Sequence, residues 1–212
     1  MTAMHDALSF HTLPPNLLGT QLLADEAGPS SDIAVPVAVP ELIIAPAVTY
    51  AQLRACSSLV RRMYTWRGYR LAPNRLQPAD PNHVTIGAWL AGELVATATA
   101  SRDSAAGLLA DGLYQDELTR LRGPSRVVCE VTRLAVDLDC HDPELLNALF
   151  KATYQYVRAV FGGTEVVIEV NPRHAGYYRR TMGFQHIGSL RTCPRVDAPA
   201  VLLHRTLANF HY

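Results

Sequence analysis

The sequence has few of the features that mark membrane, metal-binding or secreted proteins. No stretch of its 212 residues approaches the ~20 apolar residues of a membrane span, so we expect no stable membrane insertion. The four cysteines form no CxxC pair and have no zinc-ligand spacing with histidine, so we expect neither a metal site nor a disulfide framework. The N-terminus has no basic segment before an apolar run, and we therefore expect cytoplasmic localisation.

Net charge is also absent, because nineteen basic residues balance nineteen acidic ones. A general nucleic-acid binder needs a strong basic excess to neutralise phosphates, so we expect no nucleic-acid partner. Lys151 is the only lysine, and positive charge therefore means arginine almost everywhere. The charge lies in blocks: residues 1–48 hold five acidic residues and no basic one, whereas residues 49–79 hold six arginines and no acidic residue.

The first 48 residues are typical of an arm. They contain Pro14-Pro15, the break Gly28-Pro29-Ser30-Ser31 and further prolines, which remove backbone donors. Residues 33–44 could still form an edge strand, because edge strands tolerate proline. We predict a partly irregular N-terminal arm over residues 1–48 and one folded domain over residues 49–212.

The remaining sequence alternates between helical and strand patterns. Thr49 and Gln52 have the spacing of a capping box, which predicts a helix from Tyr50 to Arg67 that ends at Gly68. Further helices are predicted over residues 114–121, 144–161 and 174–182. Strands are predicted over residues 84–90, 94–100, 126–136, 165–170, 185–190 and 200–207. This order predicts an α/β fold in which helices cover both faces of a central mixed sheet.

Two segments point to acyl transfer. Residues 171–184 (Asn-Pro-Arg-His-Ala-Gly-Tyr-Tyr-Arg-Arg-Thr-Met-Gly-Phe) resemble the part of the GCN5-related N-acetyltransferases (GNAT) in which a strand ends in asparagine and the next helix carries a tyrosine before a Gly-Phe turn. Residues 130–136 (Glu-Val-Thr-Arg-Leu-Ala-Val) resemble the GNAT strand that separates from its neighbour and polarises a thioester carbonyl with free N–H groups. The resemblance implies a GNAT-like fold with a central mixed, mostly antiparallel sheet and helices on both faces.

The loop after the second segment departs from the GNAT pattern. In that fold a glycine-rich loop binds the coenzyme A pyrophosphate at a helix N-terminus. Here residues 137–143 read Asp-Leu-Asp-Cys-His-Asp-Pro, with no glycine, three carboxylates that would repel a pyrophosphate, and a proline without an N–H. We therefore expect the acyl donor to be a carrier-protein thioester rather than coenzyme A.

More specific resemblances support that expectation. The Glu130-x-x-Arg133 strand resembles the E-x-x-R strand of acyl-homoserine-lactone autoinducer synthases, which take acyl groups from acyl carrier protein. Over residues 49–207 the chain is most similar to the long-chain N-acyl amino acid synthases, including N-acyltyrosine synthases. The motifs that carry this similarity are Arg67-Gly68-Tyr69, Thr97 with Asp103-Ser104, Leu121-Arg122, residues 130–136, Asn171-Pro172-Arg173-His174 and residues 198–203.

The resemblance implies an enzyme that joins a fatty acyl thioester to an amino acid amine and needs no tightly bound cofactor. The amine must be neutral to attack, and Glu130 is the candidate general base. Arg133 either binds the amino acid carboxylate or orients Glu130 through a salt bridge, and Arg173 is the other candidate for the carboxylate. Tyr178 could protonate the leaving thiolate or line the pocket. The predicted catalytic set is Glu130, Arg133 and Tyr178.

The other candidates form two groups. The predicted substrate-binding residues are Tyr64, Trp66, Tyr69, Thr132, Leu134, Ala135, Val136, Asn171, Arg173 and His174, with backbone N–H groups of residues 134–136 for the oxyanion. The predicted docking residues for an acidic acyl carrier protein are Arg54, Arg61, Arg62 and Arg67. Simpler readings exist: Asn171 caps a helix, His174 packs beside it, and the arginines form a solvated face. An autoinducer synthase, a coenzyme A-dependent acetyltransferase and a non-enzymatic lipid- or carrier-binding domain are the alternatives.

Overall fold

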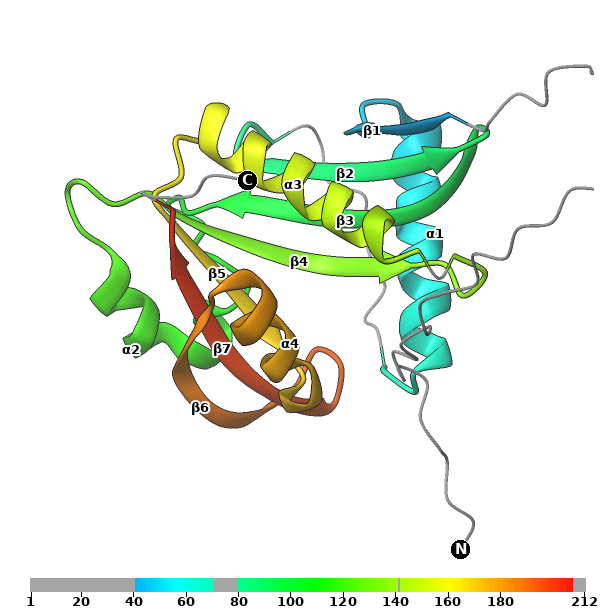
Figure 1. The fold of residues 1–212 in the computed structure, drawn as a ribbon. Helices are drawn as coiled ribbons and strands as arrows, with labels where there is room; N and C mark the ends of the chain where they lie inside the picture. The colour runs from blue at the N-terminus through cyan, green and yellow to red at the C-terminus, as the bar shows by residue number, and fades with distance from the viewer. Residues whose placement is uncertain (1–40, 71–79, 141, 208–212) are drawn as a thin grey trace, which may run out of the picture. The chain divides into compact units, whose positions relative to one another are not determined.

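In the part of the chain that the structure describes, seven strands form one sheet in the order β1-β2-β3-β4-β5-β7-β6 (Figure 1). The structure, a computed structural model, describes residues 41–70, 80–140 and 142–207. The strands are β1 (Leu42–Pro46), β2 (His83–Leu90), β3 (Glu93–Arg102), β4 (Val128–Val136), β5 (Glu165–Val170), β6 (Gln185–Cys193) and β7 (Ala198–Thr206). Neighbouring strands are antiparallel except β4 and β5, which are parallel. The predicted mixed, mostly antiparallel sheet is confirmed.

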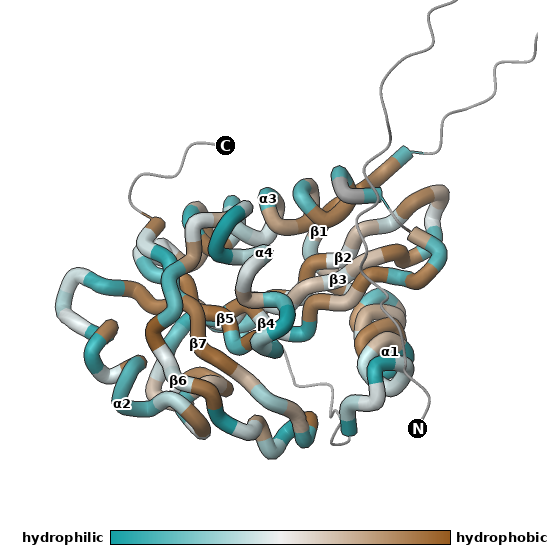
Figure 2. Tube along the Cα trace, turned by 60° about the horizontal axis from the view of Figure 1, so that its bottom comes forward, coloured by the Kyte–Doolittle hydropathy of each residue, from teal (hydrophilic) through white to brown (hydrophobic). Residues whose placement is uncertain are grey.

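Among the described residues, four helices cover the two faces of this sheet: α1 (Tyr50–Trp66), α2 (Asp111–Leu121), α3 (Pro143–Ala159) and α4 (Pro172–Met182). Leu149 of α3 is buried in the same apolar cluster as Ile168, and α4 packs against that cluster. Leu118 of α2 is buried with Val167, whose side chain points to the opposite face because neighbouring residues of a strand alternate. The strands at the centre are correspondingly apolar (Figure 2). The predicted helices on both faces are confirmed.

The sequence signals for the helix ends also hold. The Thr49 side chain accepts a hydrogen bond from the Gln52 N–H, and the Gln52 side chain accepts one from the Thr49 N–H, which completes the capping box of α1. Gly68 follows with φ of 78°, a left-handed conformation that glycine adopts without steric cost. At the C-terminal end of α3, Val157 is fully buried, whereas the C-cap residue Val160 is exposed.

The first strand lies within the segment assigned to the arm. β1 pairs with β2 over its whole length, from Leu42 opposite Leu90 to Pro46 opposite Ile86. Pro46 is accommodated because β1 is an edge strand with a neighbour on one side only. Residues 33–40 of the predicted edge strand lie outside the described residues.

Candidate active site

The parallel strands β4 and β5 pair only at their N-terminal ends. Their register runs from Val128 opposite Glu165 to Glu130 opposite Val167 and then stops, although β4 continues to Val136 and β5 to Val170. The outer edges of the two strands are occupied by β3 and β7. Beyond Glu130 the facing edges therefore carry backbone N–H and C=O groups without a strand partner. The divergence of the two strands is visible in Figure 1.

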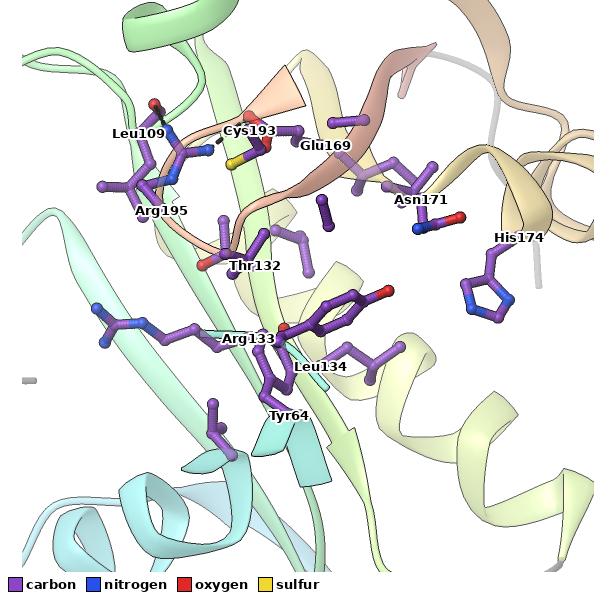
Figure 3. A pocket seen from close by; sticks show the side chains of 18 of the residues that line it. Tyr64, Leu109, Thr132, Arg133, Leu134, Glu169, Asn171, His174, Cys193 and Arg195 are labelled. Carbon is purple, nitrogen blue, oxygen red and sulfur yellow. Dashed lines mark hydrogen bonds and ion pairs between the residues drawn. The ribbon is translucent and has the colours of Figure 1, made fainter. Parts of the chain in front are cut away.

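A cavity of about 650 Å³ lies in this opening. It is lined by residues from both faces of the sheet, with Tyr64 of α1 and Leu109 on one side and Phe150 of α3 and Tyr178 of α4 on the other. Figure 3 shows part of this lining. The volume lies within the range of small-molecule sites, which are mostly apolar with a few polar groups.

Three unpaired polar atoms mark this cavity as a binding site. Among the described residues, the buried side-chain polar atoms without a hydrogen-bond partner are Oε1 of Glu130, Oγ1 of Thr132 and Nδ2 of Asn171. All three residues line the cavity. Buried polar groups are normally paired, so unpaired ones indicate where ligand or water groups bind. The cavity therefore offers an acceptor, a hydroxyl and an amide donor to a bound molecule.

Glu130 is completely buried, and one of its oxygens is held by a loop. Its Oε2 atom accepts hydrogen bonds from the backbone N–H of Leu109 at 2.7 Å and of Ala110 at 3.3 Å. Burial raises the pKa of Glu130 to about 7, and the two amides moderate that rise. A carboxyl group with this pKa can take up a proton near neutral pH. No Glu130–Arg133 salt bridge is formed between these two described residues, and the partners of the Glu130 carboxyl group are instead the two loop amides.

Arg133 lies at a β-bulge in β4. Between Thr132 and Ala135 the strand advances three residues, while β3 advances two, from Thr99 to Thr97. Arg133 has φ of 53°, which is costly for a residue with a Cβ atom. Backbone strain of this kind gathers at functional sites. The side chain lines the cavity and forms no ion pair with a carboxylate of the described residues, so its guanidinium is suited to bind an anionic ligand group.

The α4 side of the cavity carries Asn171, His174 and Tyr178. The Asn171 Oδ1 atom accepts a hydrogen bond from the Arg173 N–H at 3.2 Å, which confirms the helix cap, while its amide nitrogen stays unpaired. Burial, with Arg67 and Arg173 nearby, lowers the pKa of His174, so its ring is neutral at pH 7. Burial raises the pKa of Tyr178, which keeps its hydroxyl protonated.

Most of the predicted site residues meet at this cavity. Those that line it are Tyr64, Tyr69, Glu130, Thr132, Arg133, Leu134, Asn171, His174 and Tyr178. They come from α1 and the turn after it, β4, the end of β5 and α4. The rings of Tyr64 and Tyr69 pack edge to face, with their centroids 5.7 Å apart. Asn171 and His174 lie at one end of the cavity in Figure 3, and Arg133 points away from them.

Four predicted substrate-binding residues do not line the cavity. Ala135 is buried under α1 in a separate apolar cluster, and Val136 packs into the main core, because the bulge re-aims the side chains that follow it. Trp66 is 50% exposed, since residues two positions apart on a helix point in different directions and Tyr64 faces inward. Arg173 is exposed, and its Nε atom donates to the Asn171 amide oxygen at 3.2 Å.

The predicted docking arginines separate into three environments. Arg61 and Arg67 line the cavity and are exposed. Arg62 forms an ion pair with Asp137, the first residue after β4. Arg54 lies over the ring of Tyr50, 5.8 Å from its centroid. Only the first two are therefore placed beside the cavity opening.

Two charged residues of the cavity were not predicted. Arg195, in the connection between β6 and β7, donates to Oε2 of Glu169 at 2.5 Å and to the carbonyl of Leu109 at 2.8 Å (Figure 3). Both Arg195 and Glu169 line the cavity. Glu169 carried the same sequence signal as Glu130, an acidic residue in an otherwise apolar strand, whereas Arg195 had none.

Comparison with known proteins identifies the family. The family described as N-acyl amino acid synthase FeeM matches residues 55–206. The chain belongs to the N-acyl amino acid synthase family. FeeM from uncultured soil microbes, itself an N-acyl amino acid synthase, is 27% identical, with a TM-score of 0.72 and 79% of this chain and 91% of FeeM covered. No curated protein sequence is detectably similar.

Other solved structures share the fold of this N-acyl amino acid synthase family member. Escherichia coli ElaA is 16% identical, with a TM-score of 0.58 and 78% of this chain and 99% of ElaA covered. An acyl-CoA N-acyltransferase from Pseudomonas aeruginosa is also 16% identical, with a TM-score of 0.55 and the same coverage. The protein is an N-acyltransferase with a GNAT fold. In the described residues no helix could cross a membrane, and no three His, Cys, Asp or Glu side chains cluster as metal ligands.

Proposed function

We propose that this N-acyltransferase transfers a long-chain fatty acyl group from acyl carrier protein to the amine of an amino acid. The observation that carries the proposal is the Oε1 atom of Glu130, which is buried and unpaired in a residue that lines the cavity. The new C–N bond forms as the C–S bond of the thioester breaks, and the attacking amine must lose a proton. A carboxylate with a pKa of about 7 is suited to accept it.

The opening between β4 and β5 suits the thioester arm of the donor. An extended phosphopantetheine arm contains amides, which can pair with free strand edges as an added strand does. Donors for the oxyanion are then at hand in the backbone N–H groups of the bulge around Arg133 and in the Thr132 and Asn171 side chains. The Tyr178 hydroxyl, which burial keeps protonated, is the candidate proton donor to the leaving thiolate.

The amino acid acceptor needs a cation for its carboxylate. Arg133 supplies a guanidinium in the cavity that is not paired with a described carboxylate, and a guanidinium can bind a carboxylate through two parallel hydrogen bonds. Arg195 is less suited, because Glu169 already occupies one edge of its guanidinium. We therefore assign the acceptor carboxylate to Arg133 and the acceptor amine to Glu130.

The start of α3 favours a carrier protein over coenzyme A. The Asp142 side chain accepts a hydrogen bond from the Glu144 N–H at 2.8 Å, and Pro143 has no N–H to offer. A pyrophosphate at this helix N-terminus would lose donors and meet a carboxylate. The exposed Arg61 and Arg67 at the cavity match the acidic surface expected of an acyl carrier protein.

Product analysis tests the proposal. The protein is mixed with acyl carrier protein charged with a lauroyl, myristoyl or palmitoyl chain and with each amino acid in turn, and N-acyl products are measured by mass spectrometry. We expect one or a few amino acids to be acylated, with the corresponding acyl-coenzyme A thioesters reacting more slowly. The absence of an N-acyl product with every amino acid and both donors would contradict the proposal.

A further inference from the structure

The amides that hold Glu130 belong to a loop that is fixed at its base. This loop, residues 103–110, joins β3 to α2, which begins at Asp111. Arg122 donates to the Asp103 carboxylate at 2.6 Å and to the Asp111 carboxylate at 2.7 Å, so one guanidinium ties the two ends of the loop together. Charge-assisted hydrogen bonds of this kind are strong and directional, so they fix the distance between Asp103 and Asp111 at the two ends of the loop.

Arg195 fixes the centre of the same loop. Its guanidinium donates to the Leu109 carbonyl at 2.8 Å. That carbonyl belongs to the same peptide unit as the Ala110 N–H, which donates to Glu130. A hydrogen bond at one end of a peptide group polarises the other end and strengthens its hydrogen bond. Arg195 thus acts on Glu130 through a single peptide bond.

Glu169 in turn holds Arg195. Its carboxylate is 9% exposed and accepts from Arg195 at 2.5 Å. Glu169 and Glu130 lie on the same face of the sheet, because Glu130 is paired with Val167 and side chains two residues apart share a face. Of these two carboxylates, Glu169 therefore has an arginine partner, whereas Glu130 is held by backbone amides.

We propose that Arg195 and Glu169 are positioning residues for Glu130: together they fix the Leu109–Ala110 peptide, which grips one carboxylate oxygen and leaves the other directed to the acceptor amine. The amine as ligand rests on the proposed function, whereas the positioning of Glu130 does not. The two residues act on Glu130 with opposite sign, since the Glu169 charge favours the protonated form of Glu130 and the Arg195 charge favours the ionised form.

Two further titratable groups near these carboxylates, a thiol and a phenol, are uncharged near pH 7. Burial raises the pKa of the Cys193 thiol on β6 and raises that of Tyr114 on α2 to about 12. On β3 the residue opposite Glu130 is Ser101, which is not ionisable in this range. Arg133, on the strand of Glu130 itself, and the cluster of Arg122 with Asp103 and Asp111 at the base of the loop are charged, and they are unchanged in every variant below.

The chain contains a matched control for this pair. Arg191 forms an ion pair with Glu117 at 2.7 Å and also donates to a backbone carbonyl, that of Leu113. The exposed fractions are nearly the same, with 34% and 8% for the side chains of Arg191 and Glu117 against 35% and 9% for Arg195 and Glu169. The control pair does not line the cavity.

The experiment measures the pKa of Glu130 directly by carboxyl-carbon NMR in the full-length protein, and the pH dependence of kcat/KM beside it. We expect Glu169→Gln to lower the Glu130 pKa and Arg195→Met to raise it, each by about one unit. In each variant the acidic limb of the pH profile of kcat/KM should shift in the same direction as the Glu130 pKa. Glu117→Gln and Arg191→Met should move neither. Equal shifts in the control variants, or no shift in the Glu169 and Arg195 variants, would overturn the proposal.

Arg195→Lys separates position from charge. It keeps the cation but cannot hold Leu109 and Glu169 with one planar fork, so we expect a Glu130 pKa close to that of the wild type and kcat about tenfold lower. An unchanged kcat would overturn the positioning role. If the wild type makes no N-acyl product, the proposed function fails, while the NMR titration still decides whether Arg195 and Glu169 control Glu130.

Discussion

The Oε2 atom of Glu130 accepts the Leu109 backbone N–H at 2.7 Å, while its Oε1 atom has no partner among the described residues. One oxygen of the carboxyl group is thus fixed by a hydrogen bond, and the other can still form one. An anchored oxygen fixes the direction of the free one, and burial lifts the pKa of the group into the neutral range. This arrangement has consequences for stability as well as for catalysis.

The first prediction concerns stability and pH. The pKa of Glu130 is raised from an ordinary value of 4.5 to about 7 in the folded protein. Between these values the folded state binds more protons than the unfolded state, so stability falls as pH rises through this window and levels off above it. Glu130→Gln has no proton to lose. Its free energy of unfolding should therefore improve relative to wild type by about 3 kcal/mol between pH 4 and pH 8.

Urea denaturation at both pH values measures this difference. Effects of other titrating groups cancel, because wild type and variant share them. A difference in unfolding free energy that does not change with pH would show that Glu130 titrates normally in the folded protein.

The second prediction concerns the strained backbone at Arg133, whose φ is 53°. Arg133→Gly and Arg133→Ala both remove the guanidinium, but only glycine accepts a left-handed conformation without steric cost. We expect the glycine variant to be the more stable by about 1 kcal/mol. Thermal or urea unfolding measures the difference, and both variants should show a raised KM for the amino acid. Equal stability of the two would indicate that the bulge relaxes.

The fold and one half of the site followed from local signals. The capping box at Thr49, the alternation of the strands and the acidic residue Glu130 within an apolar strand are each recognisable from a few neighbouring residues of the sequence. Glu169 has the same sequence signal as Glu130 and was identifiable in principle. Arg195 was not, because its contact with Leu109 joins segments 86 residues apart through the packing of the sheet.

The bulge and the edge strand show two further limits. Positive φ is usually signalled by glycine, and at the bulge the residue is Arg133. Prolines in the first 48 residues indicated irregular structure, yet Pro46 closes an edge strand where its missing N–H faces no partner strand. In both cases tertiary structure overrides the preference of the residue.

The third prediction concerns Tyr178 and the apolar space behind it. A second cavity of about 50 Å³, lined chiefly by apolar groups, shares Tyr178, Phe150, Val131 and Ile168 with the main one. Tyr178→Ala should connect the two and shift the preferred acyl chain to a longer one, whereas Tyr178→Phe should keep the preference and lower kcat about tenfold. Competition between acyl donors of different length measures the preference. Full activity of Tyr178→Phe would show that Tyr178 lines the cavity without donating a proton.

The fourth prediction concerns donor docking. Arg61 lies at the cavity, whereas Arg54 stacks on Tyr50 elsewhere on α1. We expect Arg61→Glu to raise the KM for acyl carrier protein about tenfold and to weaken its salt dependence, and Arg54→Glu to have a much smaller effect. Initial rates at two salt concentrations measure both. Equal effects of the two reversals would point to a diffuse charge effect rather than to a docking site.

The most direct test of the central claim, that Glu130 is the general base of an acyl-carrier-protein-dependent amide synthesis, is the pH profile of kcat/KM for wild type and Glu130→Gln. For the wild type we predict a rise with pH through an apparent pKa of about 7, the value that burial gives Glu130. For Glu130→Gln we predict a rate lower by about 10²–10⁴-fold and without that limb. A variant that keeps the wild-type rate and profile would contradict the account.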